Sequence, residues 1–134
     1  MLSVNISQAA RSSGLSSKAL RHYEEIGLLV PSRGANGYRQ YTASDVETLR
    51  FIQRARVSGF STGEVRALLE LRENPDRRSR ETKLLVSEKL SHLEEQLRDL
   101  LEMRTTLLAF EKSCAGNDSP ECAILDRLSG QLPG

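Results

Sequence analysis

The chain has 134 residues, of which 38% are hydrophobic and 4% aromatic, and this size and composition suit one small core plus an extended element. A large enzyme core is therefore not expected. No stretch approaches the roughly 20 continuous apolar residues that cross a bilayer, and the first residues lack the charged and then apolar regions of a signal peptide. We therefore expect a cytoplasmic protein without membrane contact, in a compartment that keeps thiols reduced.

Charge is unevenly distributed along the chain, although the formal net charge is only +1. Residues 1–62 hold eight Lys and Arg against four Asp and Glu, whereas residues 63–134 hold eleven against fourteen. The first part thus carries about +4 and the second about −3. This asymmetry indicates a polyanion such as DNA as the partner of the first part only.

Two short helices joined by a turn are predicted at the start of the chain. The first spans residues 3–11, and Gly14 breaks the chain after it. Ser16 suits the N-cap of the second helix, and Gly27 suits the C′ position at its end. Such a pair matches the helix-turn-helix motif, whose second helix enters the major groove of DNA, although a small helical bundle would show the same pattern.

A β-hairpin is predicted after the second helix, because an Asn-Gly pair at residues 36–37 separates a short apolar segment from an alternating one. The first part of the chain is therefore expected to be a winged helix-turn-helix domain. Arg33 and Arg39 on this wing could reach phosphates. Tyr38 and Tyr41 are expected to pack the wing rather than touch DNA.

Two capping boxes predict two further helices. Thr42 and Ser61 are hydroxyl N-caps, and Asp45 and Glu64 follow them at the third position. Each helix has apolar residues at core-facing spacing, and an Asn-Pro pair stops the second. We therefore assign residues 1–75 to the DNA-binding domain.

A long uninterrupted helix is predicted next, since neither Pro nor Gly occurs between residues 79 and 112. Such a helix would be roughly 50 Å long. Its apolar residues recur in steps of four and three, broken only at Arg104, and form a heptad seam. We define the seam as Val86, Leu90, Leu93, Leu97, Leu100 and Leu107.

A single chain of this size is not expected to bury the seam against its small first domain. We therefore predict a homodimer through residues 76–112, with a helix folded back on its own domain as the alternative. Residues 113–134 would then form a metal-binding loop, a short helix and a tail. The predicted fold class is mainly α.

Cys114 and Cys122 are the only thiols of the chain. Two thiolates supply the soft ligands that Cu(I) prefers, whereas a closed zinc site normally has four ligands. A monovalent ion between two thiolates leaves a charge of −1, which the start of a short helix near Cys122 could stabilise, with Lys83 as a second contributor. A divalent ion and a thiol redox switch are the alternatives.

Several segments together resemble a MerR-family transcriptional regulator, and the resemblance covers nearly the whole chain. The combined pattern is specific, whereas each piece alone is not. The segments are residues 5–10, 17–29, 36–41 and 55–60 and the long helix. The resemblance implies a homodimer whose antiparallel long helices help to enclose an effector site. It also implies activation of promoters with an overlong spacer, by distortion of the DNA between the elements that RNA polymerase binds.

The resemblance also implies roles for individual residues. The expected DNA contacts are Lys18, Arg21 and Tyr23 on the second helix and Arg39 on the wing, with Arg54 and Arg56 as weaker candidates. The two-cysteine tail, together with Ser79, is similar to that of the copper-efflux regulators in the family. Members that answer divalent ions tend to carry a cysteine at the position of Ser79, reaching the site from the partner chain, and serine is a poor soft ligand. Ser79 also suits the N-cap of the long helix.

The sequence therefore predicts a metal-responsive transcription activator that senses Cu(I), with Ag(I) and Au(I) as alternatives, through Cys114 and Cys122. A sensor of divalent Zn, Cd or Pb, or of thiol oxidation, with the same architecture is the alternative. The chain departs from the copper-efflux pattern at Ala115, where a proline often follows the first cysteine. No catalytic constellation occurs, so no enzyme activity is expected.

Overall fold

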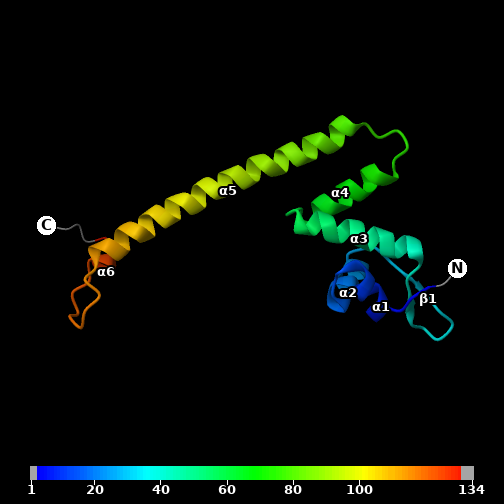
Figure 1. Cartoon of the computed structure of the whole chain (residues 1–134), viewed down its shortest axis with the longest axis horizontal. Coiled ribbons are helices and arrows are strands. Elements are labelled where there is room, and N and C mark those ends of the chain that lie inside the picture. The colour runs from blue at the N-terminus through cyan, green and yellow to red at the C-terminus, as the bar shows by residue number, and fades with distance from the viewer. Residues whose placement is uncertain (1–2, 131–134) are drawn as a thin grey trace. The chain divides into compact units, whose positions relative to one another are not determined.

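The computed structural model describes residues 3–130, which form a mainly α fold as predicted (Figure 1). In chain order the elements are α1 (Ile6–Ser13), α2 (Ser17–Glu25), β1 (Ser32–Arg33), β2 (Arg39–Gln40), α3 (Ala43–Val57), α4 (Thr62–Glu73), α5 (Ser79–Ser113) and α6 (Ala123–Leu128). Contacts within the chain define two compact units, the first ending at Thr82 and the second beginning at Lys83. The predicted boundaries at residues 75 and 112 stay predictions.

Helix α1 begins later than the sequence predicted. Its N-cap is Asn5, whose side-chain oxygen accepts a hydrogen bond of 2.9 Å from the Gln8 N–H. The Asn5 N–H in turn donates a hydrogen bond of 2.9 Å to the side-chain oxygen of Gln8. Val4, which was expected to be helical, instead pairs with Tyr41 through two backbone hydrogen bonds of 2.8 Å. The tertiary bridge therefore keeps residue 4 out of the helix.

Helix α2 begins and ends as predicted. The Ser16 hydroxyl accepts a hydrogen bond of 3.0 Å from the Ala19 N–H. Gly27 follows the end of the helix with φ 71°, a left-handed conformation that glycine adopts without a steric penalty.

The wing is a short antiparallel hairpin in which Ser32 faces Gln40 and Arg33 faces Arg39. The apolar segment before it does not form the first strand, because Leu29 and Pro31 are buried in the core instead. In the turn, Gly37 has φ 82°, a left-handed conformation that glycine adopts without a steric penalty. The first strand is therefore made by residues expected in the turn.

The core of the first unit lies where α1 packs against α2 and α3, and where α3 packs against α4. Both capping boxes are confirmed, with hydrogen bonds of 2.9 and 3.0 Å at Thr42 and of 2.8 and 3.2 Å at Ser61. Each fully buried apolar side chain contributes about 1.5–3 kcal/mol to the core. These side chains include Leu20, Leu49, Ile52 and Val65.

The second unit consists of most of α5, the loop after it and α6. None of the residues of α5 is buried, and the seam side chains are exposed by 37% at Leu93 to 64% at Leu107. The end of α6 lies against the end of α5, since the Arg127 guanidinium carbon is 5.4 Å from the Phe110 ring centroid. Among the described helices, none combines the length and apolar character needed to span a bilayer.

Candidate DNA interface and candidate metal site

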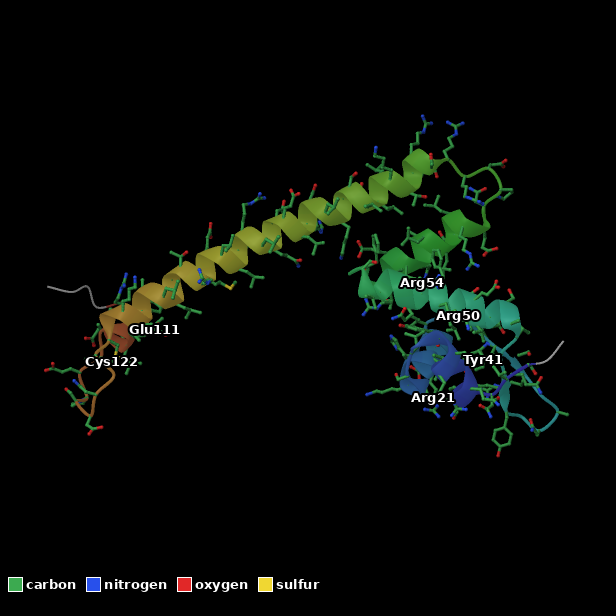
Figure 2. All side chains as sticks on the ribbon, viewed as in Figure 1. Arg21, Tyr41, Arg50, Arg54, Glu111 and Cys122 are labelled. Carbon is green, nitrogen blue, oxygen red and sulfur yellow. The ribbon has the colours of Figure 1, made fainter. Side chains whose placement is uncertain are left out.

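Helix α2 presents two of the predicted DNA contacts to solvent and buries the third. Lys18 is exposed, and so is Arg21, which is labelled in Figure 2. Tyr23 is only 5% exposed, and its ring lies 6.1 Å from that of His22. Tyr23 therefore packs the helix onto the core, and a DNA contact by its side chain stays a prediction.

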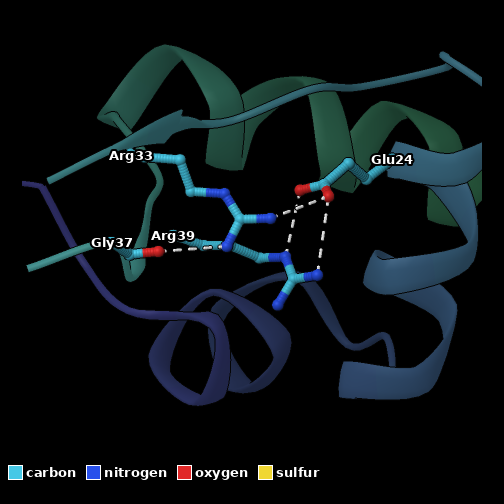
Figure 3. A network of polar contacts seen from close by, with 4 residues as sticks. All are labelled: Glu24, Arg33, Gly37 and Arg39. Carbon is cyan, nitrogen blue, oxygen red and sulfur yellow. Dashed lines mark hydrogen bonds and ion pairs between the residues drawn. The ribbon is translucent and has the colours of Figure 1, made fainter.

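The wing arginines are both held by one carboxylate of α2 (Figure 3). Arg39 donates from Nε to Oε1 of Glu24 at 3.0 Å, and Arg33 donates from Nη2 to Oε2 at 3.1 Å. Arg33 also donates to the Gly37 carbonyl at 3.2 Å. Tyr38 is 73% exposed, so the expectation that it packs the wing is wrong; it lies before β2, beside the exposed turn of the hairpin.

A polar cleft of about 610 Å³ lies between the start of α1, helix α2 and the wing. Its cationic lining residues are Arg21, Arg33 and Arg39. Guanidinium groups suit phosphate oxygens, because their planar forks donate paired hydrogen bonds. The cleft is therefore the part of the first unit with the chemistry of a phosphate-binding surface.

Two further predicted contacts lie at the end of α3. Arg54 is exposed (Figure 2). The guanidinium of Arg56 donates to the Phe60 carbonyl at 2.7 Å, which stabilises the end of the helix. Arg54 is thus the better placed of the two to reach a phosphate, and both assignments stay predictions.

The structure brings the two thiols together near the end of α5, where Figure 2 labels Cys122. The Cys114 and Cys122 sulfurs are 3.5 Å apart, which is longer than a disulfide bond of about 2.05 Å. Metal–thiolate bonds measure about 2.3 Å, so both sulfurs can contact one ion. Within the described part of the chain, no group of three or more His, Cys, Asp or Glu residues is arranged to hold a metal. The two soft donors of this loop therefore fit a soft ion.

The start of α6 also lowers the pKa of the Cys122 thiol. Cys122 is the residue before α6, and the backbone N–H of Leu125 lowers the pKa of its thiol, assisted by the Cys114 thiol and the Ile124 N–H. Desolvation and the carboxylate of Asp126 act in the opposite direction. Backbone N–H groups near a thiol stabilise its charged form, so the start of α6 makes Cys122 easier to deprotonate.

Ser79 and Lys83 lie at the far end of α5 from the thiols within one chain. Ser79 is the first residue of this helix and Cys114 follows its last residue. At about 1.5 Å per residue, Lys83 is roughly 45 Å from the loop. A role for either residue at the metal site therefore requires a second copy of the chain, and both roles stay predictions.

Comparisons with known proteins agree with this arrangement. Residues 4–71 match the model of the MerR HTH regulatory family, and residues 46–110 match its DNA-binding model. The chain belongs to the MerR family. It is therefore a DNA-binding transcriptional regulator and not an enzyme.

Individual relatives of this MerR-family regulator match over nearly its whole length. The regulator HmrR of Rhizobium leguminosarum bv. viciae is 48% identical over 94% of this chain and 98% of its own. The regulator CueR of Salmonella typhi is 43% identical over 95% of this chain and 93% of its own. Among solved structures, PbrR691 of Ralstonia metallidurans CH34 in complex with lead(II) has a TM-score of 0.83 and 28% identity, covering 93% of this chain and 98% of the other.

Sequence reasoning missed two residues of this MerR-family regulator that organise its sites. Glu24 was not recognised as the partner of the wing arginines, although an acidic residue in a basic segment was a usable signal. Phe110 was not connected with Arg127, because a cation–π contact between residues on two different helices has no periodic signature.

Proposed function

We propose that this regulator is a metal-responsive transcription activator that senses Cu(I), or Ag(I) or Au(I), through Cys114 and Cys122. The single observation that carries the proposal is the separation of 3.5 Å between the two sulfurs. Thiolates are the preferred ligands of soft monovalent ions. Such an ion would supply a positive charge that ties the two ends of the loop together.

The choice of a monovalent ion is supported by the donor set of the loop. Asp118 and Glu121 are exposed and do not join the thiols in a group of three or more metal ligands. Ser79 supplies no soft donor. The resemblance of the two-cysteine tail, together with Ser79, to that of the copper-efflux regulators of the family also supports a monovalent ion.

A divalent ion is the second candidate. The specific support for it is the similarity to PbrR691, whose structure contains lead(II). A divalent site would take further ligands, which a second chain or exposed carboxylates of the loop would have to supply.

The active species in our proposal is a homodimer on promoter DNA. The seam is exposed in one chain, and burial of its six apolar side chains against a second copy would stabilise the pair. An antiparallel arrangement would bring Ser79 and Lys83 of the second copy toward the thiols. By analogy with the family, the dimer would act on RNA polymerase by distorting the promoter.

X-ray absorption on the reduced protein loaded with Cu(I) tests the ligand set. We expect a shell of two sulfurs, and replacement of either cysteine by serine should weaken Cu(I) binding by more than about 100-fold, since even changes outside the ligand shell cost about 10- to 100-fold. Binding of promoter DNA should persist in both variants. Competition with a Cu(I) chelator measures the affinity.

Two further variants separate the candidates. Asp118→Asn is the matched control in the same loop and should leave Cu(I) affinity unchanged. Ser79→Cys should raise the response to Zn²⁺ or Cd²⁺ by adding a soft ligand. A shell of three or more sulfurs, or strong scattering from oxygen and nitrogen, would contradict the two-thiolate proposal and favour the divalent candidate.

A further inference from the structure

Two arginines of like charge lie directly opposite each other in the wing. Arg33 and Arg39 are register partners in the antiparallel pair of β1 and β2. Like charges in this relation repel each other and destabilise a hairpin. A hairpin with two-residue strands therefore needs a compensating negative charge nearby.

Glu24 of α2 supplies this charge through both of its carboxylate oxygens (Figure 3). In addition to the two shorter contacts, Arg39 Nη2 lies 3.5 Å from Oε2. The side chain of Glu24 is 19% exposed, compared with 24% for Arg39 and 48% for Arg33. Partial burial makes these charge-assisted contacts stronger than those of freely exposed pairs.

The contacts of Glu24 join two elements that are separate in the sequence. They link residues nine and fifteen positions apart. Across residues 3–130, no other side-chain hydrogen bond or ion pair connects α2 with the wing. Among the described residues, the Glu24 carboxylate is therefore the polar side-chain link that holds the wing arginines to α2.

We propose that Glu24 is a positioning residue of the DNA interface, which fixes the wing arginines relative to α2 so that both elements fit one duplex together. This inference rests on the DNA-binding function of the family. One carboxylate and two guanidiniums leave a charge of about +1, and both guanidiniums still line the cleft beside Arg21. Glu24 thus lowers the net positive charge of the wing and fixes the positions of its two guanidinium groups.

The charge of Glu24 and its positioning role have opposite effects on DNA binding. A carboxylate near phosphates repels them, so charge alone predicts tighter binding when it is neutralised. Loss of positioning predicts a weaker preference for the correct sequence. Glu25 is the matched control, because it is exposed, adjacent and makes no ion pair in the described part of the chain.

The experiment compares Glu24→Gln with Glu25→Gln in the full-length protein. The probes are a duplex of about 30 bp, roughly three helical turns, that the wild-type protein enriches from a random-sequence library, and a scrambled duplex of the same composition. We expect Glu24→Gln to reduce the preference for the selected duplex by about tenfold, similar to the effect of one mismatched base pair. Glu25→Gln should leave the preference within about twofold. Equal effects of the two variants would overturn the proposal.

A second variant keeps the test valid if Glu24→Gln impairs folding. Arg39→Lys retains the charge but loses the fork that contacts both oxygens of Glu24. It should reduce the preference by a similar factor without changing the salt dependence of binding. The double variant should be no worse than either single one, because both break the same contact.

Two further outcomes distinguish failure of the positioning role from failure of DNA binding. Additive losses in the double variant would show that Glu24 and Arg39 act independently, which overturns the positioning role. Failure of the wild-type protein to enrich any duplex would instead refute DNA binding by this chain, and the inference with it. Far-UV circular dichroism and thermal melting of each variant establish that the comparison concerns folded protein.

Discussion

The two units of the chain place their apolar residues in opposite environments. The first unit buries residues such as Leu49, Ile52 and Val65 within itself, whereas α5 leaves its leucines open to solvent. Burial of apolar surface is the main favourable contribution to folding. The first unit therefore specifies its own fold, while the second contains a surface whose stability depends on what covers it.

The two units also differ in charge and in chemistry. The first carries the excess of cations and the cleft lined by three arginines. The second carries the excess of carboxylates and both thiols. Our proposal therefore assigns the DNA contacts to the first unit and the metal signal to the second.

Substitutions in the seam should have the largest effect, which is loss of the dimer or of the folded state. Leu93→Asp combined with Leu97→Asp should give monomers or unfolded chains, because burying two carboxylates in an apolar dimer interface costs several kcal/mol. Sedimentation measures the oligomeric state. The control Ser87→Asp with Ser91→Asp adds the same charge away from the seam and should remain dimeric. A stable dimer in the first variant would show that the seam is misplaced.

Leu49→Ala tests the self-contained core of the first unit. We expect a loss of about 2–5 kcal/mol in the free energy of unfolding, since Leu49 is fully buried and its truncation leaves a cavity. Denaturant titration measures this loss. The exposed neighbour Glu47→Ala should change stability by about 0.5 kcal/mol or less. A negligible effect of Leu49→Ala would contradict the proposed source of stability.

Lys18→Ala tests whether the cations of the first unit contact DNA phosphates. If Lys18 contacts one phosphate, the slope of log affinity against log salt should fall by about 0.9. Fluorescence anisotropy with a duplex at several salt concentrations gives the slope. The same substitution at Lys112, in the second unit, should leave it unchanged. Equal slopes for both variants and the wild type would remove Lys18 from the DNA contacts.

Tyr41→Phe should have the smallest effect. The Tyr41 hydroxyl is buried and has no hydrogen-bond partner among the described residues, so its removal should be neutral or stabilising by up to about 1 kcal/mol. Burial raises the pKa of Tyr41 above its ordinary value of 10.0. Stability from this group is complete below pH 10 and is lost as the pH rises toward the folded pKa, because the unfolded chain ionises first. Melting curves above pH 10 should therefore lose less stability in the phenylalanine variant.

The sequence alone determined the features that depend on near neighbours. The capping boxes at Thr42 and Ser61 were predictable because each cap bonds a backbone group three residues away. The long helix was predictable because no proline or glycine interrupts it and its leucines recur at helical spacing. The MerR-family resemblance was recognisable for a similar reason, since it rests on short segments in a fixed order.

Only the tertiary structure decided the features that depend on contacts between distant residues. The start of α1 is set by the bridge from Val4 to Tyr41, and the wing is held by Glu24 on another element. The separation of the thiols depends on how the loop and α6 fold back on α5. Local signals specify which residues enter a helix or a turn, but the packing of separate elements fixes which side chains meet.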